Sequence, residues 1–255
     1  MNFVDTHCHL QFDKLATNLD QVINDAGDAG VTRLICVGTN VDDSQKAVDI
    51  AAKHENIWAT IGVHPHDGKN FFEQKNSAVR LQDLLTKPRV VAVGEIGLDF
   101  YKNYSPKADQ EKLLRLQIEI GIPTGLPFVF HVREAFSDFW RIFDAYPNLR
   151  GVIHSFSATS KELDQALSRG LYVALNGIMT FTSDQAQLEA AKQVPKDKLL
   201  LETDAPFLTP KAHRGKTCEP KHIRDIAEFL ATLRGEDIKE LAGYTTKNAK
   251  ELFGI

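Results

Sequence analysis

Residues 90–131 read VVAVGEIGLDFYKNYSPKADQEKLLRLQIEIGIPTGLPFVFH and contain the unit on which the predicted fold is built. An apolar run at 90–95 is followed by residues 108–120, where apolar side chains recur at the spacing of an amphipathic helix. A second apolar run follows at 127–131. The order strand, helix, strand is typical of a βαβ unit, whose two strands are parallel. Residues 90–131 therefore predict an α/β fold with a parallel sheet.

The same unit recurs along the whole chain of 255 residues. Short runs rich in Val, Ile and Leu predict strands at 3–8, 33–37, 57–62, 90–95, 127–131, 151–154, 171–175 and 199–202. Intervening patterns predict helices at 18–29, 44–54, 77–85, 108–120, 135–146, 161–168 and 186–193, and two or three more follow from about residue 220. Eight units without an intervening linker match a closed barrel of about 250 residues. We predict one (β/α)8 TIM-barrel domain over residues 1–255 with extra C-terminal helices; a doubly wound open sheet is the structural alternative.

Composition and charge limit the class of protein. Hydrophobic residues make up 43% and charged residues 25%, as in ordinary globular enzymes, which excludes collagen-like, disordered and disulfide-scaffold chains. The net charge of −4 excludes an overall basic surface but leaves room for a local basic rim that engages phosphates. No coiled-coil or long exposed apolar pattern is present, so we expect a monomer.

The start of the chain and its cysteines bear on its location. The start, MNFVDTHCHL, has neither a basic leader nor an apolar run, and no later stretch approaches the length of a membrane span. The three cysteines form no CxxC pair, and their odd number suits reduced thiols better than a disulfide framework. We therefore expect a cytoplasmic protein without a membrane segment.

Histidines and acids gather where predicted strands end. Six of the nine histidines lie at or just past such ends: His7, His9, His64, His66, His131 and His154. Glu95 ends the fourth predicted strand, and the run Glu202-Thr203-Asp204 ends the eighth. In a barrel the carboxyl ends of the strands meet at one face, which is where such folds carry their chemistry. His54 and His222 lie in helical patterns, and we interpret them as surface residues.

The types and spacing of these residues predict a metal centre. His7 and His9 are two apart on a strand, so their side chains share a face. A mixed set of imidazoles and carboxylates suits Zn²⁺ or Mn²⁺, whereas Mg²⁺ prefers an oxygen-rich shell. The two oxygens of Glu95 can bridge two cations, and paired cations stabilise both the attacking and the leaving oxygen of a displacement. A lone histidine is more often structural, but the joint set predicts a binuclear site of two divalent cations (Zn²⁺, Mn²⁺ or Mg²⁺).

Six motifs in order make the chain resemble the TatD family of metal-dependent deoxyribonucleases, within the amidohydrolase-like barrels. They are DTHCHL at 5–10, GVHPH at 62–66, VGEIGLDF at 93–100, HVREA at 131–135, HSFSA at 154–158 and ETDAPFLTP at 202–210. The resemblance implies that His7, His9 and Asp204 bind one cation. It also implies that Glu95 bridges to a second cation, held by His131 and His154. Ala158 and Cys218 depart from the usual family pattern, and neither is a predicted ligand.

The predicted function is hydrolysis of phosphodiester bonds, most simply as a deoxyribonuclease that degrades from an end. Metal coordination lowers the pKa of a bound water, and Glu95 and Asp204 are the expected catalytic carboxylates, with Asp204 orienting or deprotonating that water. The expected partner is a nucleic acid, DNA before RNA.

Further residues are expected to serve the substrate or the ligands. For phosphate contacts we expect Arg133 and Arg214, with His64 and His66 lining the pocket rather than binding metal. Tyrosines within residues 99–107 can stack terminal bases. Asp99 and Glu202 are expected to orient ligands from behind.

Two alternatives remain open. One is a hydrolase of the same kind acting on another bond, such as the ester of an aminoacyl-tRNA or a small amide or lactone. Its metal centre would look the same, so substrate turnover discriminates. The other is a non-catalytic interaction protein that binds metal. Its mark would be a lost ligand, and the sequence lacks none of those predicted.

Overall fold

Eight strands follow one another in a single sheet in the order β1 to β8, so each lies beside its neighbour in the chain. They are β1 (Phe3–Cys8), β2 (Val31–Val37), β3 (Ile57–Ile61), β4 (Val90–Asp99), β5 (Phe128–Arg133), β6 (Gly151–Ile153), β7 (Tyr172–Leu175) and β8 (Leu199–Leu201). The pairs β1–β2, β3–β4, β4–β5, β5–β6 and β7–β8 are parallel. The last strand leads back to the first through a parallel bridge between Cys8 and Ala205. This closed order confirms the predicted (β/α)8 barrel class.

The computed structural model describes all residues, 1–255, and its helices lie between the strands. The α-helices are α1 (Asp13–Ala16), α2 (Leu19–Asp28), α3 (Val41–Ala51), α4 (Gly68–Glu73), α5 (Ser77–Leu84), α6 (Lys107–Gly121), α7 (Phe136–Phe143), α8 (Ser160–Ser168), α9 (Gln185–Gln193), α10 (Ile223–Arg234) and α11 (Ile238–Phe253). The helical patterns located all of them except α1 and α4, which are too short to show a periodicity. No helix combines the length and apolar character needed to cross a bilayer.

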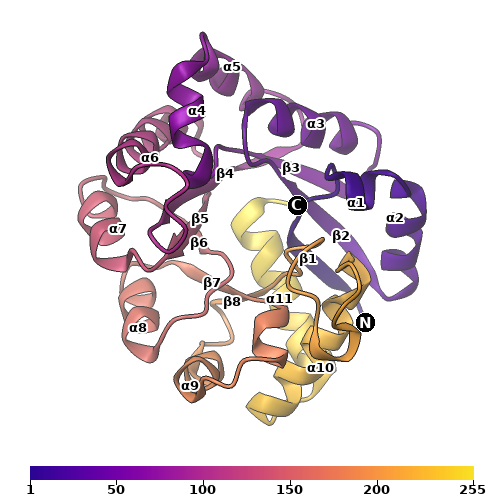
Figure 1. Ribbon diagram of the computed structural model, residues 1–255. Coiled ribbons are helices and arrows are strands. Elements are labelled where there is room, and N and C mark those ends of the chain that lie inside the picture. Colours follow the sequence, from indigo (N-terminus) through magenta and orange to yellow (C-terminus); the bar gives the residue numbers. More distant parts are fainter. The chain divides into compact units, whose positions relative to one another are not determined.

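The chain divides into two compact units, and the first comprises Met1–Cys36 with Ser155–Ile255. It contains β1, most of β2, β7 and β8. The C-terminal helices α10 and α11, yellow in Figure 1, pack on β1 and β8. Nδ2 of Asn248 in α11 donates to the carbonyls of Lys196 and Leu199, at 2.7 and 2.8 Å, which fixes α11 to the start of β8. The predicted C-terminal helices therefore bury the strands that carry the first and last motifs.

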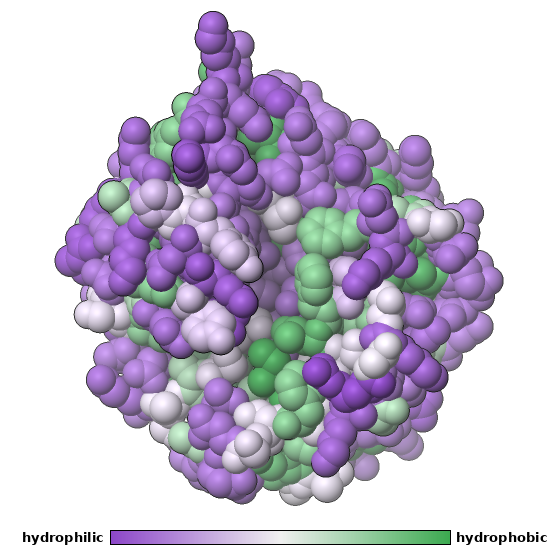
Figure 2. All heavy atoms as spheres, viewed as in Figure 1, coloured by the Kyte–Doolittle hydropathy of each residue, from purple (hydrophilic) through white to green (hydrophobic).

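The second unit, Val37–His154, contains β3 to β6 and helices α3 to α7. Helix α6 packs on β4 and α3 on β3. Phe130 of β5 is fully buried, with its ring 5.1 Å from that of Phe139 and 5.7 Å from that of Phe143, both in α7. Most side chains over α4 and α5, at the top of Figure 2, are hydrophilic, although Val79 of α5 is exposed. The unit thus has its own aromatic core beneath a polar surface. The prediction of one domain over residues 1–255 stays a prediction.

Strand β4 is longer than predicted, because it continues four residues past Glu95 to Asp99. Its last residues stay paired with β5, in the register Gly97 with His131 and Asp99 with Arg133. Gly97 has a φ of +152°, and a Cβ built on it would lie 1.8 Å from the carbonyl oxygen of His131. Only a residue without a side chain allows this close approach. Glu95 therefore lies inside a strand, and Asp99 takes the strand end.

Candidate metal centre

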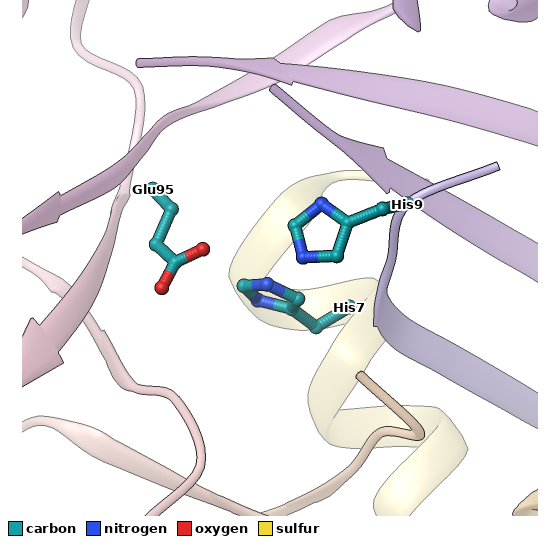
Figure 3. A group of neighbouring side chains, drawn as sticks. All are labelled: His7, His9 and Glu95. Atoms are coloured by element: carbon teal, nitrogen blue, oxygen red, sulfur yellow. The ribbon is translucent and has the colours of Figure 1, made fainter. Parts of the chain in front are cut away.

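His7, His9 and Asp204 form a cluster within the first unit, which we call the first cluster. Nε2 of His7 lies 3.7 Å and Nε2 of His9 3.3 Å from Oδ1 of Asp204. Both histidines are buried, and their rings project from the same side of β1, as their spacing predicts (Figure 3). Figure 3 also draws Glu95 of β4, whose neighbours in the second unit are described below. Two imidazoles and a carboxylate in contact are a donor set suited to Zn²⁺ or Mn²⁺.

Backbone hydrogen bonds place Asp204 beside β1. The Asp204 N–H donates to the His7 carbonyl at 2.8 Å, and the His9 N–H donates to the Ala205 carbonyl at 2.7 Å. Asp204 has a φ of +60°, a left-handed conformation that turns the chain sharply after β8. The residues after β8 therefore continue along β1, and this brings the carboxylate to the histidines.

The buried carboxylate of Asp5 holds this arrangement, and its role was not predicted. Oδ2 of Asp5 accepts a hydrogen bond from the Thr203 hydroxyl at 2.6 Å, and Oδ1 accepts from the N–H groups of Thr203 and His7, at 2.9 and 3.2 Å. Burial raises the pKa of Asp5 to about 7, although these hydrogen bonds oppose the rise. Asp5 thus positions the predicted ligand His7 and also Thr203, the residue before the predicted ligand Asp204.

Glu202 is hydrogen-bonded next to a predicted ligand, and its supporting role stays a prediction. Its buried Oε1 accepts hydrogen bonds from the Ser155 N–H at 2.6 Å and from Nδ2 of Asn176 at 3.1 Å. Asn176 also donates to the Ser155 hydroxyl at 2.9 Å. Ser155 directly follows His154 in the sequence. Glu202 and Asn176 therefore fix the backbone next to a predicted ligand. Nothing in the sequence pattern singles out Asn176.

Glu95 is the centre of a second cluster, formed with His64, His131 and His154 in the second unit. Its Oε1 lies 2.8 Å from Nδ1 of His131, 3.0 Å from Nε2 of His154 and 3.4 Å from Nε2 of His64. Burial alone would raise the pKa of Glu95, but the adjacent histidines outweigh it and hold this pKa well below its usual value. Glu95 is therefore an ionised carboxylate among three imidazoles.

His64 belongs to this second cluster, although the sequence predicted that it lines the pocket rather than binds metal. One donor atom each of His64, Glu95 and His131 lie within 4.8 Å of one another, a set that can hold a metal ion. Burial lowers the pKa of His64 well below its usual value, which favours the neutral imidazole that a cation requires. The loop places it here, since the His64 N–H donates to the Thr39 carbonyl at 2.8 Å. The predicted pocket-lining role of His64 stays a prediction.

Asp99 lies behind the second cluster. Its Oδ2 is 2.9 Å from Nε2 of His66 and 3.3 Å from Nε2 of His131. His131 therefore lies between two carboxylates, with Glu95 on one ring nitrogen and Asp99 on the other. Metal-binding histidines commonly have such a partner, which fixes the tautomer and the ring orientation. The supporting role expected of Asp99 stays a prediction.

Each predicted phosphate-binding arginine lies over an aromatic ring. The guanidinium of Arg133 is 3.9 Å from the ring centroid of Tyr101 in the second unit. In the first unit the guanidinium of Arg214 is 4.3 Å from the ring centroid of Phe181 and donates to the Thr209 carbonyl at 3.3 Å. Both arginines are exposed. The rings hold each cation at the surface without neutralising it.

The burial of two other residues is shown by the structure, and for His222 it corrects the prediction of a surface residue. His222 is buried rather than at the surface, because its ring stacks on His213 at 4.5 Å and its Nδ1 accepts the Glu219 N–H at 3.0 Å. Cys218, one of the departures from the family pattern, is fully buried. All three cysteines are buried and none of them forms a disulfide.

Comparison with known proteins identifies the family of the chain. Residues 4–254 match the family described as TatD related DNase. The chain belongs to the TatD family. It is 35% identical over 258 residues to the 3'-5' ssDNA/RNA exonuclease TatD of Escherichia coli K12, covering 98% of each chain. It is 34% identical over 253 residues to the uncharacterized metal-dependent hydrolase YabD of Bacillus subtilis, again covering 98% of each. The predicted family membership is confirmed.

Solved structures of TatD proteins have the same fold. The TatD homologue YJJV of Escherichia coli K12 matches with a TM-score of 0.92 and 27% identity, covering 99% of this chain and 98% of that one. A TatD family hydrolase from Entamoeba histolytica matches with a TM-score of 0.90 and 26% identity, with the same coverage. The barrel of this TatD-family chain is therefore that of its family along its whole length.

Proposed function

We propose that this TatD-family chain is a divalent-metal-dependent exonuclease that shortens single-stranded DNA by hydrolysing phosphodiester bonds. The observation that carries the proposal is the pair of clusters described above, each of buried imidazoles around a carboxylate. Relatives about 35% identical along the whole chain include proteins named as 3'-5' ssDNA/RNA exonucleases and as metal-dependent hydrolases. We therefore expect degradation from the 3' end.

The chemistry of both clusters fits divalent cations. Each imidazole nitrogen lies 2.8 to 3.7 Å from the carboxylate oxygen of its cluster, and the histidines are at least half-buried. In the proposed centre His7, His9 and Asp204 would hold one cation, His131 and His154 would hold another, and Glu95 would supply the carboxylate shared between them. When bound, such cations lower the pKa of a coordinated water and offset negative charge at the phosphate. Mn²⁺ and Zn²⁺ suit these donors best, and Mg²⁺ less well.

The remaining residues of the proposal act on the water and the strand. Asp204 orients the attacking water and accepts its proton. Arg133 and Arg214 contact phosphates of the strand, since each is an exposed cation held in place by a ring. Asp99 and Glu202 position the histidines and the chain next to them. We further propose that the protein acts as a monomer in the reducing cytoplasm, where its three cysteines stay reduced.

The proposal is tested with purified protein freed of metal by EDTA and then supplied with Mn²⁺, Mg²⁺ or Zn²⁺. A single-stranded oligonucleotide labelled at its 5' end should yield a ladder of progressively shorter labelled strands, and the same strand labelled at its 3' end should release labelled mononucleotide. Glu95→Gln should abolish both without loss of fold. Glu73→Gln, which changes an exposed carboxylate in α4, should retain full activity and controls for a contaminating nuclease.

Two results would reject the nuclease proposal. The first is an intact strand with every metal while an aminoacyl ester, amide or lactone is hydrolysed, which would assign the same centre to another bond. The second is equal DNA loss with the parent and with folded Glu95→Gln, which would assign the activity to a contaminant. The parent protein should also lose its activity in EDTA and regain it when metal is returned.

A further inference from the structure

The loop after β4 exposes two tyrosines within four residues of each other. The side chain of Tyr101 is 51% exposed and that of Tyr104 is 67% exposed. Aromatic side chains contribute large apolar surfaces, which folded proteins usually bury. Tyrosines exposed on a loop at the carboxyl end of a barrel strand lie where such folds bind their substrates. These two rings are therefore placed for a ligand.

The backbone of this loop is fixed at both ends. Oδ1 of Asp99 accepts the N–H groups of Tyr101 and Lys102, each at 3.0 Å. Nε2 of Gln110 donates to the carbonyls of Asp99 and Ser105, at 3.1 and 2.8 Å. A loop held in this way presents its side chains without a further ordering cost when a ligand binds.

The two tyrosines differ in how their rings are used. The ring of Tyr101 already carries the guanidinium of Arg133, 3.9 Å from its centroid. The ring of Tyr104 meets His66 edge to face, with centroids 4.8 Å apart and planes at 78°. His66 in turn lies 6.4 Å, between ring centroids, from His131 of the second cluster. Tyr104 is therefore the more exposed ring, and a single histidine separates it from that cluster.

We propose that Tyr104 is the stacking platform for a nucleobase at the end of the strand, beside the phosphate that is cleaved. This inference rests on the proposed function and names how that site holds its substrate. Base stacking on aromatic side chains tolerates every base, because each has a π face, and neighbouring cations such as Arg133 can hold the adjoining phosphate. A base that stacks on a side chain has left its partner, so the platform selects unpaired ends.

The test compares Tyr104→Ala with Tyr104→Phe and with Tyr146→Ala. Tyr146 is half-buried and lies between α7 and β6, at the opposite end of the strands from the clusters, so it is a matched tyrosine control. Each protein is assayed on two single strands, one normal and one whose nucleotide at the cleaved end is abasic. Tyr104→Ala should raise KM for the normal strand about tenfold, the size expected for one lost base stack, with kcat retained. Tyr104→Phe and Tyr146→Ala should match the parent.

The abasic strand separates stacking from other effects. Parent and Tyr104→Ala should have the same raised KM on it, because the group that stacks is gone. A KM penalty of equal size on both strands, or no penalty on either, overturns the inference.

Equilibrium binding distinguishes this inference from the nuclease proposal. Anisotropy of a labelled single strand is measured in EDTA with the parent and with Tyr104→Ala. If the protein binds the strand in a Tyr104-dependent way but cleaves nothing, the proposed exonuclease fails and the platform stands. If the strand is cleaved but binding and KM are the same for the parent and for Tyr104→Ala, the stacking platform is overturned and the exonuclease proposal stands. If neither cleavage nor Tyr104-dependent binding is found, both are overturned.

Discussion

Oδ2 of Asp99 lies 2.9 Å from Nε2 of His66, so the carboxylate that ends β4 holds an imidazole from the loop after β3. The same oxygen reaches Nε2 of His131 at 3.3 Å, while Oδ1 accepts two backbone N–H groups of the loop that carries Tyr104. One side chain thus joins the second cluster to the loop proposed to bind the strand. Metal binding and strand binding should therefore respond together when Asp99 is changed.

Asp99→Ala should lower the affinity for Mn²⁺ by about 10- to 100-fold, because His131 loses the partner that orients its ring. It should also raise KM for single-stranded DNA, because the loop at 100–106 loses its anchor. Calorimetric titration with Mn²⁺ and steady-state kinetics measure the two effects. Asp83→Ala, which removes an exposed carboxylate from α5, is the control. Unchanged metal affinity in folded Asp99→Ala would contradict the positioning role.

Asp204→Asn separates proton transfer from ligation. Backbone hydrogen bonds hold this residue in place, so the amide should occupy the position of the carboxylate. At saturating Mn²⁺ we expect kcat to fall by about 10²- to 10⁴-fold, the usual effect of losing a general base. The measurement is single-turnover cleavage across a range of Mn²⁺ concentrations. Recovery of full activity at high Mn²⁺ would show that Asp204 serves only as a ligand.

Asp5→Asn should change how stability depends on pH. The folded pKa of about 7 is above the ordinary aspartate value of 3.8, so below about pH 4 both states bind the proton and the contribution of Asp5 to stability is fully present. As pH rises toward 7 the unfolded chain releases its proton first, and this contribution is lost. Asparagine does not titrate. Urea unfolding of metal-free protein at roughly pH 5 and pH 7.5 should therefore show the variant gaining stability relative to the parent at the higher pH. Parallel profiles would contradict the shifted ionisation of Asp5.

Gly97→Ala should disturb the second cluster through the backbone. The added Cβ would lie 1.8 Å from the His131 carbonyl oxygen, so β5 must move at the residue that carries a ligand. We expect a loss of about 2 kcal/mol or more in the free energy of unfolding, together with weaker Mn²⁺ binding. Gly27→Ala in α2 is the matched control, since its Cβ would meet nothing within 4 Å and a helical alanine is neutral or stabilising. Equal stability of the two variants would be the contrary result.

The sequence predicted the strands because each buried strand is a short apolar run between polar turns. The sequence underestimated the length of β4, because Gly97 and Asp99 are residue types that are common in turns. Only the structure shows that Gly97 stays in the strand, in close contact with the His131 backbone. From their places at strand ends the sequence pattern selected six candidate ligands, which the structure gathers in two clusters and whose role as ligands stays a prediction: His7, His9, Glu95, His131, His154 and Asp204. It missed Asp5 because the partner, Thr203, is 198 residues away and only the folded chain brings the two together. The contact of His64 with Glu95 could not be predicted either, because it depends on the path of the loop that carries His64.

The hydrogen bonds that Asp5 accepts from Thr203 and that His9 donates to Ala205 also set an order of events during synthesis. The ribosome releases β1 first, yet this strand completes its pairing only after about four fifths of the chain has emerged. Until then one edge of β1 is open, and the nascent chain lacks the third member of the first cluster. A product that stops before Asp204 therefore never acquires a complete first cluster. Translation past residue 204 is therefore a condition for the proposed activity, and shorter copies of the chain lack the proposed metal site.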